Sequence, residues 1–490
     1  MIPAGSGRSL RSPLLGALAA FAFALALQGA RPLWEPDEGR YVDVALEMLR
    51  SDDWWTPRLH HEVPHYSKPP LTYWAVAASV SAFGRNEWAA RLPTALAFGA
   101  TILLVGGIAR RLAPGIATTA SIVYATSLLP FVAANIVTTD TLVTLFGTLG
   151  VAGFVELRFG SGPAEPARWV LWGGFGLAFL TKGPPGVLAL LAILLFHWRD
   201  RRSGTAGRRL VSPGSLLLFL VVAFGWFAHE MRLRPDLVGY LLGDEVFRRI
   251  DSPAFHRHAG WLGLVRAYGP VAVAGLLPWW PLAALRRRPP GPRMADAAAR
   301  RFLRCWLLVP LAVFVVSQSR LPLYLLPLAA PGAIWVAARV APLGRTRRSR
   351  LVIVGWAAFL LCLKGAVALV PSHRDGRRFA AELAAQLPGP PTEVAFVEAR
   401  PRYSLSLYLE CEVEEIDLAT VQLRPREPSY RPAAEPLTEE LADAEGLRVF
   451  LVPYRAHRAW VAELAAAGLA STSGGSIEGF MIHLDPERIR

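Results

Sequence analysis

Residues 350–371, RLVIVGWAAFLLCLKGAVALVP, form an apolar run that follows a basic cluster and ends at a proline. A transmembrane helix needs about 20 mostly apolar residues, so this run predicts a membrane span. Similar runs precede it and together predict eleven spans, over residues 12–30, 88–108, 115–133, 139–157, 169–181, 184–198, 211–229, 263–285, 303–319, 321–341 and 350–371. The sequence therefore predicts a polytopic all-α membrane bundle of about 11 to 13 transmembrane helices.

The composition agrees with a large membrane protein. Hydrophobic residues make up 53% of the 490 and charged residues only 18%, with a mean hydropathy of +0.33, whereas about a quarter of the residues in a soluble chain are charged. The net charge of +14 is scattered between the apolar runs, so we interpret it as topological and expect no nucleic-acid partner. The three cysteines are too far apart in sequence to suggest a disulfide or a zinc motif.

The distribution of arginine fixes the predicted topology. The segment 71–84 has only about 14 apolar residues and is predicted to be interfacial or re-entrant. If it is not counted and the N-terminus is inside, the positive-inside rule is satisfied in every cytoplasmic loop. Those loops hold the clusters Arg110–Arg111, Arg158–Arg168, Arg199–Arg209, Arg286–Arg304 and Arg345–Arg350. A cleaved signal peptide is the alternative for 12–30, but a run of that length crosses a membrane by itself.

The composition changes after Pro371. Residues 372–490 contain 13 Lys and Arg against 19 Asp and Glu, a net charge of −6. Short β-rich runs alternate there with helical stretches such as His457–Leu469. They are Glu393–Glu398, Cys411–Asp417, Arg448–Tyr454 and Phe480–Leu484. We therefore predict a transmembrane domain over 1–371, whose first extracytoplasmic loop is 31–87, and a small extracytoplasmic α/β domain over 372–490.

The first outside loop carries acidic residues directly after a span. Asp37 and Glu38 precede residues with helical spacing of apolar side chains, Val42 to Leu49, which predict an amphipathic helix in the membrane interface anchored by Trp54 and Trp55. Asp37 suits a helix N-cap, and it also suits a general base. The two roles are compatible, because a capping carboxylate that stays ionised still accepts a proton.

Lysine is rare in this chain. Lys68 and Lys182 are two of only three lysines, and each stands at an outside turn followed by a pair of prolines. Prolines suit the first turn of a helix, whose positive end adds to the lysine charge, so each turn is a candidate phosphate site. The alternative is a lysine that snorkels from a helix end to the interface.

Further polar groups interrupt the apolar runs on the same predicted face. Asp140 lies between two runs, where an ionisable residue suggests a functional site, although an N-cap is the alternative. The loop from Gly243 carries Arg249, His256 and His258 and is also explained as a solvated basic loop. Arg320 and Tyr324 break the apolar stretch near residue 320.

We find no P-loop, no dinucleotide glycine pattern outside a span, no His-Glu-x-x-His and no nucleophile elbow, and Gly173-Gly174-Phe175-Gly176 is interpreted as helix packing. Several short motifs, in order over residues 31–330, instead resemble the C-type superfamily of membrane glycosyltransferases. The resemblance is to the branch with the lipid A aminoarabinose transferases and the dolichyl-phosphate-mannose protein mannosyltransferases. The motifs are Asp37-Glu38-x-Arg40-Tyr41, Pro57-Arg58-Leu59 after Trp55, Lys68-Pro69-Pro70-Leu71-x-Tyr73-Trp74, Arg91-Leu92-Pro93, Thr181-Lys182-Gly183-Pro184 and Arg320-Leu321-Pro322-x-Tyr324.

The resemblance implies inverting transfer of a sugar from a polyprenyl-phosphate carrier, such as undecaprenyl phosphate, to a lipid, glycan or protein acceptor outside the inner membrane. It implies that Asp37 is the general base, and that Glu38 and Asp140 are acidic groups near the reacting centre. The residues that the resemblance implies for binding the donor phosphate are Lys68, Arg40, Arg58, Tyr66, Lys182, Arg249, Arg320 and Tyr324. His256 and His258 are implied acceptor or loop residues.

The family often has Glu before the Lys-Pro-Pro turn, whereas this chain has Ser67, so no cofactor is assigned and a divalent metal is left open. Two other functions remain open from the residues alone. A transporter or flippase would use Lys182 and Asp140 along a midplane pathway. A membrane scaffold would present the acidic C-terminal domain to partners.

Overall fold

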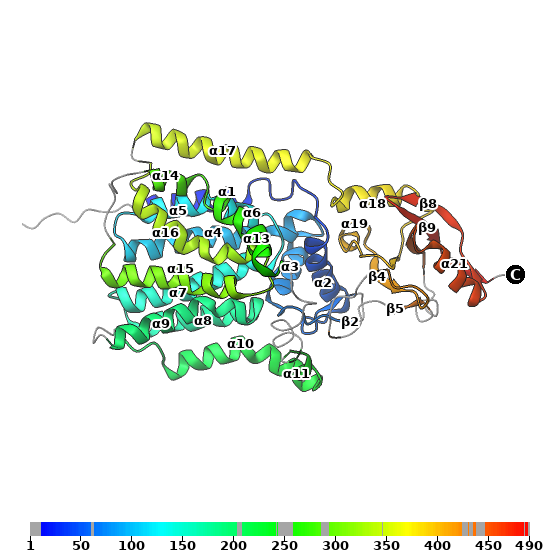
Figure 1. Ribbon diagram of the computed structural model, residues 1–490, viewed down its shortest axis with the longest axis horizontal. Helices are drawn as coiled ribbons and strands as arrows, with labels where there is room; N and C mark the ends of the chain where they lie inside the picture. The colour runs from blue at the N-terminus through cyan, green and yellow to red at the C-terminus, as the bar shows by residue number, and fades with distance from the viewer. Residues whose placement is uncertain are drawn as a thin grey trace, which may run out of the picture. The chain divides into compact units, whose positions relative to one another are not determined.

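The computed structural model of the chain (Figure 1) describes residues 11–59, 63–202, 208–241, 243, 258–285, 294–344, 346–423, 430, 435–437, 446–484 and 486–488. The chain forms two compact units. Unit 1 comprises residues 1–28, 91–229 and 249–366, and unit 2 comprises 29–90, 230–248 and 367–490.

Unit 1 is built from helices, which the apolar runs predicted. They are α1 (Arg11–Leu25), α4 (Glu87–Leu112), α5 (Ala117–Ala125), α6 (Leu128–Ala133), α7 (Thr139–Phe159), α8 (Ala164–Lys182), η1 (Pro184–Val187), α9 (Leu188–Arg202), α10 (Pro213–Leu233), α13 (Gly260–Ala274), α14 (Trp279–Leu285), α15 (Ala297–Val316), η4 (Pro322–Leu328), α16 (Ala329–Val340) and α17 (Arg347–Leu369). The ends of α4, α10 and α17 reach into unit 2.

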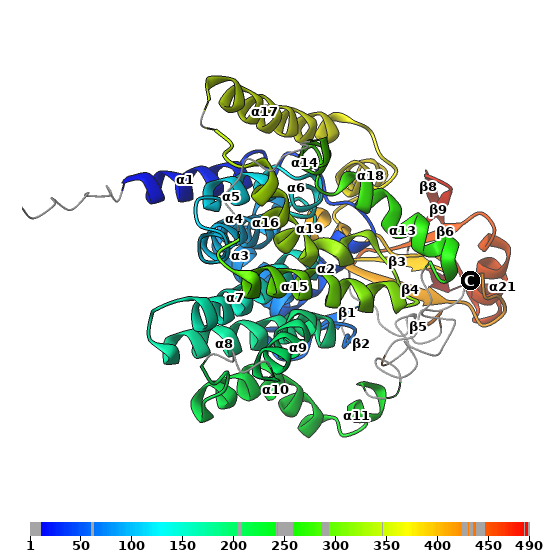
Figure 2. The same cartoon turned by 60° about the vertical axis from the view of Figure 1, so that its left-hand side comes forward.

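Helices α7 and α8 lie side by side along their lengths (Figure 2), and glycine allows their close approach. A Cβ atom at Gly153 would lie 2.3 Å from the backbone nitrogen of Leu171, and one at Gly174 would lie 2.5 Å from that of Gly150. Small residues of this kind let helix backbones meet in membrane proteins. The interpretation of the glycine cluster around Gly174 as helix packing is confirmed.

Five described helices are long and apolar enough to cross a membrane: Glu87–Leu112, Thr139–Phe159, Pro213–Leu233, Pro322–Val340 and Arg347–Leu369. The pair α13 and α14 is a sixth if it counts as one span bent by 72°. The other predicted spans also hold helices, but α1 has 15 residues, and α5 and α6 are separate helices of 9 and 6 residues. Segment 71–84 forms a helix of 13 residues.

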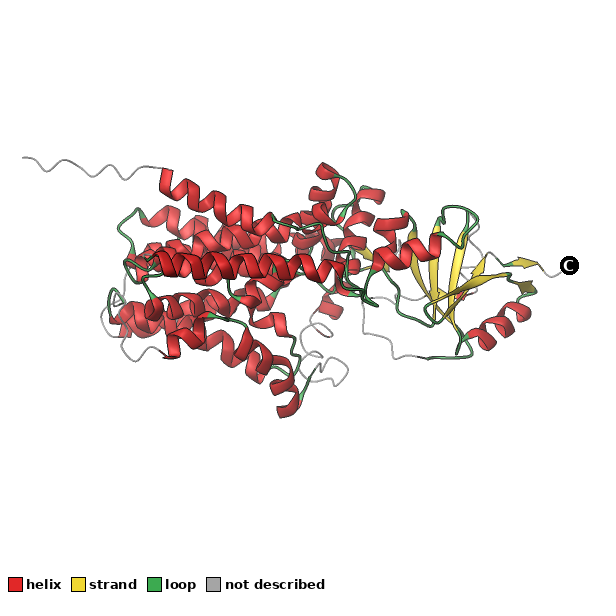
Figure 3. Ribbon diagram, turned by 90° about the horizontal axis from the view of Figure 1, so that it is seen from above, coloured by secondary structure: helices red, strands yellow, loops and turns green. Residues whose placement is uncertain are grey.

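Unit 2 combines a mixed sheet with short helices (Figure 3). Its elements are α2 (Asp37–Ser51), β1 (Arg58–Leu59), β2 (Val63–Pro64), α3 (Leu71–Phe83), α11 (Leu237–Gly239), α18 (Gly376–Ala384), β3 (Glu393–Val397), α19 (Leu405–Leu409), β4 (Glu412–Asp417), β5 (Glu435–Pro436), β6 (Arg448–Pro453), α21 (His457–Ala466), β7 (Leu469–Ala470), β8 (Ser473–Ile477), β9 (Phe480–Leu484) and β10 (Glu487–Arg488).

The six-stranded sheet has the order β5-β4-β3-β6-β9-β8, with parallel pairing from β5 to β6 and antiparallel pairing of β9 with its neighbours. Each of the four predicted β-rich runs forms a strand of this sheet. The two central strands β3 and β6 are buried along almost their whole lengths, which matches their apolar sequences. Helix α21 covers the sheet through Trp460, which packs on Phe450 with ring centroids 5.1 Å apart.

Helix α2 differs from the prediction of an interfacial helix. Its predicted apolar face is buried by protein, because Val42 and Ala45 are fully buried and Leu46 is 7% exposed. The covering elements are α3 and α19, so the predicted loop 31–87 and the predicted domain 372–490 fall into one compact unit. The sequence pattern was read correctly as an amphipathic helix, but the partner of its apolar face is another part of the chain.

Candidate active site

Unit 1 holds a buried ion pair at the ends of two helices. Asp140 is the second residue of α7 and Lys182 is the last residue of α8. The Lys182 Nζ donates to Asp140 Oδ1 at 2.5 Å, and each side chain is only 9% exposed. Thr138, not Asp140, is the N-cap of α7, since its side chain accepts a hydrogen bond from the Asp140 N–H at 3.3 Å. The carboxylate of Asp140 is therefore available to the lysine.

One tyrosine lies beside this pair, and a second lies in the cluster against which the first packs. The Lys182 Nζ lies 4.5 Å from the centre of the Tyr324 ring, a cation–π contact. Tyr324 packs against the cluster that contains Tyr268, whose buried hydroxyl has no hydrogen-bond partner among the described residues. The sequence reasoning missed Tyr268, because a single tyrosine within a predicted span gives little signal.

Arg320 holds the chain around this cluster together. It is 4% exposed, and its guanidinium donates to the carbonyls of His258 and Gly260 at 2.9 Å and of Val315 at 3.0 Å. The guanidinium thus joins the start of α13 to the end of α15. His258 itself is exposed, while Arg249 and His256 lie outside the described residues.

In unit 2, the acids at the start of α2 have different surroundings. Asp37 is the first helical residue after Pro36, its side chain is 57% exposed, and its Oδ1 accepts from Arg40 at 3.1 Å. Glu38 is 1% exposed and forms an ion pair with Arg31 at 2.7 Å. Because Glu38 also accepts from the Trp34 N–H at 3.0 Å, its geometry is that of an anchor for the helix start. Asp37 is the carboxylate that faces solvent.

The chain before α2 is held by the C-terminal part of unit 2. Glu35 Oε1 accepts from the Ser404 N–H at 2.7 Å, and the Leu33 N–H donates to the Tyr408 hydroxyl at 2.8 Å. Burial raises the pKa of Glu35 to about 7, against the lowering effect of the Ser404 bond. These contacts fix the direction in which the α2 helix, with Asp37 in its first turn, leaves the preceding loop.

Other side chains of unit 2 that were predicted to bind the donor phosphate form bonds with neighbouring residues. The Tyr66 hydroxyl donates to Glu230 Oε2 at 2.5 Å, and this fully buried carboxylate also accepts from Arg234 at 2.9 Å. Burial and the Glu230 bond raise the pKa of the Tyr66 hydroxyl. The Lys68 Nζ donates to the Ser67 carbonyl at 2.6 Å just before α3. The sequence reasoning missed Glu230, which lies at the end of a predicted span.

The predicted residues thus gather in separate local groups. Unit 1 brings Asp140, Lys182 and Tyr324 together. Unit 2 pairs Asp37 with Arg40, whereas Arg58 pairs with Asp53 at 2.8 Å. Across the described ranges no three His, Cys, Asp or Glu side chains are placed to hold a metal ion.

Known proteins resemble this chain in sequence. The family model described as dolichyl-phosphate-mannose-protein mannosyltransferase matches residues 67–227. An undecaprenyl phosphate-alpha-4-amino-4-deoxy-L-arabinose arabinosyl transferase of Edwardsiella ictaluri is 29% identical over 69% of this chain and 61% of its own length. One from Sodalis glossinidius is 31% identical over 66% of this chain and 58% of its own. The chain therefore spans about three fifths of the length of these curated relatives.

Solved structures resemble it in fold. ArnT from Cupriavidus metallidurans, in a crystal structure bound to undecaprenyl phosphate, matches with a TM-score of 0.73 and 20% identity over 96% of this chain and 97% of that one. The archaeal oligosaccharyltransferase AglB from Archaeoglobus fulgidus, in complex with an inhibitory peptide and a dolichol-phosphate, matches with a TM-score of 0.52 and 12% identity over 96% of this chain and 74% of that one.

Proposed function

We propose that this chain, whose resemblance to the C-type membrane glycosyltransferases is confirmed in sequence and in fold, is an inverting glycosyltransferase. It transfers a sugar from undecaprenyl phosphate, or a similar polyprenyl phosphate, to a lipid, glycan or protein acceptor. The similarity to relatives named as undecaprenyl-phosphate aminoarabinose transferases, and to a structure bound to undecaprenyl phosphate, supports this choice of donor. The observation that carries the proposal is the buried Lys182–Asp140 pair against Tyr324.

The Lys182 ammonium suits a leaving phosphate. Negative charge develops on the phosphate oxygen as the bond to the sugar breaks, and a fixed cation in a poorly hydrated site stabilises that charge. Lys182 has three N–H donors, and Asp140 occupies one of them in the structure. Asp140 then orients the ammonium while the remaining donors face the phosphate.

Asp37 supplies the base in this proposal. Its exposed carboxylate takes the proton of the acceptor hydroxyl as the hydroxyl oxygen attacks the anomeric carbon. The carbon–oxygen bond to the phosphate breaks on the opposite face, and the carrier leaves as polyprenyl phosphate. Arg40, at 3.1 Å from Asp37, keeps the carboxylate oriented and adds positive charge near the donor.

The remaining predicted residues take supporting roles. The family resemblance assigns Lys68, Tyr324 and Arg249 to binding of the donor phosphate. Glu38, Arg58, Tyr66 and Arg320 hold the segments that carry these groups, as their ion pairs and hydrogen bonds support. The same resemblance assigns His256 and His258 to recognition of the acceptor. A divalent metal is left open, with no step assigned to it.

We further propose the inner membrane as the location. With the eleven spans that the sequence predicts, the proposed active face and the C-terminal α/β segment 372–490 would lie outside the cytoplasm, an orientation that the arginine clusters of the predicted cytoplasmic loops support. Transporter function is the competing hypothesis, and it differs in that no bond is made.

The test uses purified protein and undecaprenyl-phosphate sugar with envelope lipid as acceptor. Release of undecaprenyl phosphate should depend on acceptor, and Asp37→Asn and Lys182→Met should each abolish it. Asp52→Asn is the matched control, since Asp52 is an exposed residue at the other end of α2. Full turnover by Asp37→Asn removes the proposed base, and movement of intact substrate across sealed vesicles supports a transporter instead. Mass spectrometry of envelope glycolipids and glycoproteins from cells with and without the protein then identifies sugar and acceptor.

A further inference from the structure

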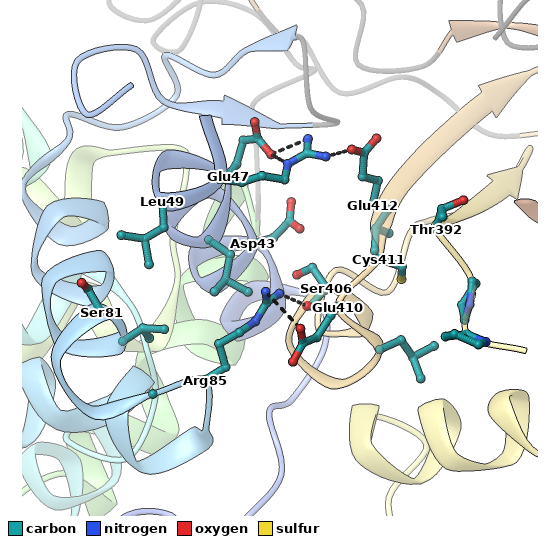
Figure 4. Close-up of a pocket in the computed structure, with 18 residues that line it drawn as sticks. Asp43, Glu47, Leu49, Ser81, Arg85, Thr392, Ser406, Glu410, Cys411 and Glu412 are labelled. Carbon is teal, nitrogen blue, oxygen red and sulfur yellow. Dashed lines mark hydrogen bonds and ion pairs between the residues drawn. The ribbon is translucent and has the colours of Figure 1, made fainter. Parts of the chain in front are cut away.

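Unit 2 contains a pocket of about 750 Å³, a volume typical of small-molecule sites. Helices α2 and α3 form one wall, and α19 with the start of β4 forms the other (Figure 4). Leu46, Val80 and Leu409 give the pocket apolar surfaces. None of the groups assigned above to sugar transfer lines it.

The two arginines of the pocket are already engaged. Arg50 forms an ion pair with Glu47 at 2.7 Å and another with Glu412 (Figure 4). Arg85 donates to the Ser406 carbonyl at 2.7 Å and lies 3.8 Å from Glu410. The lining therefore has more carboxyl groups than guanidinium groups, and its cations are occupied by neighbours.

Asp43 is the carboxyl without such a partner. It lies between the two walls, is 8% exposed, and takes part in no ion pair among the described residues (Figure 4). Its neighbour is the Ser406 hydroxyl. Burial raises the pKa of Asp43 to about 8, with Glu47 and Glu35 adding to the effect and Ser406 and Arg50 opposing it.

The Cys411 thiol beside it adds no charge, because burial raises its pKa to about 12. A buried carboxyl that stays protonated for lack of a cation ionises when a cation arrives. The pocket therefore lacks one positive group, and its apolar walls favour a ligand that also carries a hydrocarbon body.

We propose that this pocket binds a small organic ammonium ion. The ammonium group donates hydrogen bonds to the Asp43 carboxylate and the Ser406 hydroxyl, and the hydrocarbon body packs on Leu46, Val80 and Leu409. As the ligand binds, the Asp43 carboxyl releases its proton to the solvent. The ammonium ion thus enters the pocket as the proton leaves it, and the net charge of the pocket does not change. This site is separate from the proposed transfer chemistry and does not depend on it.

The experiment compares cyclohexylammonium with cyclohexanol, which have the same ring but differ in charge. Isothermal titration calorimetry of the full-length protein in detergent, at about pH 7 in phosphate and in HEPES, gives affinity and protons released. Cyclohexylammonium should bind with release of about one proton per ligand, as linkage requires for a carboxyl with a raised pKa. Cyclohexanol should bind about tenfold more weakly or worse, because it brings no cation to the Asp43 carboxyl.

Two variants make the result specific to the pocket. Asp43→Asn keeps the shape and should bind the ammonium about tenfold more weakly or worse, with no proton release. Ser81→Trp fills the pocket from an exposed lining position, whereas Ala78→Trp, exposed on the same helix outside the lining, should bind like the unmodified protein. Equal binding of amine and alcohol, retained proton release in Asp43→Asn, or no binding at about 10 mM amine overturns the proposal.

Discussion

Replacing Lys182 by methionine tests the buried ion pair of unit 1 directly. The change keeps most of the side-chain volume but leaves the Asp140 carboxylate without its partner at 2.5 Å. Both side chains are 9% exposed, so water screens the loss only weakly. Removing one partner of a buried pair costs about 3–5 kcal/mol, and the lower end, about 3 kcal/mol, applies here because the pair retains some exposure.

A double-mutant cycle separates this pairing from the loss of packing. Asp140→Asn alone leaves the ammonium unpaired and should cost a similar amount, about 3 kcal/mol. The double variant leaves no buried charge, so its cost should fall below the sum of the two by about 2 kcal/mol or more. The free energy of unfolding is measured by titration with sodium dodecyl sulfate in mixed micelles, followed by tryptophan fluorescence.

The control is the more exposed pair of Arg168 and Glu165 on α8, which are joined at 2.7 Å. Glu165 is 48% exposed in its side chain, so solvent screens the pair and the same cycle there should give no measurable coupling. If the costs of Lys182→Met and Asp140→Asn add within about 0.5 kcal/mol, the two side chains do not act as a pair and the reasoning is refuted.

Three further predictions concern single contacts. Gly153→Ala should destabilise the protein by about 1–3 kcal/mol, because the new Cβ would overlap the backbone of Leu171. Gly107→Ala is the control and should leave stability unchanged, because a Cβ there meets no atom within 4 Å. The same detergent titration measures the unfolding free energy of both variants. Arg320→Lys should cost about 2–3 kcal/mol, since a lysine cannot replace all three carbonyl bonds, and a stability equal to that of the unmodified protein would contradict this. Glu35 has a pKa of about 7 in the folded protein, above its ordinary 4.5, so the unfolding free energy should fall as pH rises from 4.5 to 7. Glu35→Gln should reduce that pH dependence, and identical pH profiles of the variant and the unmodified protein would contradict this prediction.

The sequence predicted what depends on local pattern. Apolar length located the helices of unit 1, and short β-rich runs located β3, β4, β6 and β9. It also singled out Asp140 and Lys182 as candidate functional residues, since charge between apolar runs is rare, and that role stays a prediction. Their direct pairing was not predicted, because the two residues lie 42 positions apart and no periodic pattern links them.

Long-range contacts explain the remaining differences. The apolar face of α2 was assigned to the membrane interface, since a sequence shows that a face is apolar but not what covers it. The Tyr66–Glu230 bond joins residues 164 positions apart, and its carboxylate lies at the end of an apolar run where no motif marks it. Asp43 was likewise unremarked, because within α2 it resembles any other helical acid.

Unit 2 is assembled from three stretches of the chain, 29–90, 230–248 and 367–490. A ribosome releases the chain from the N-terminus, so α2 emerges long before the segment with α19 and Tyr408 that covers it. For most of synthesis, the face of α2 that α19 later buries is therefore exposed. Proteases and chaperones can bind the nascent chain at this exposed face during that time. Folding of this unit must therefore wait until residues 367–490 have been synthesised.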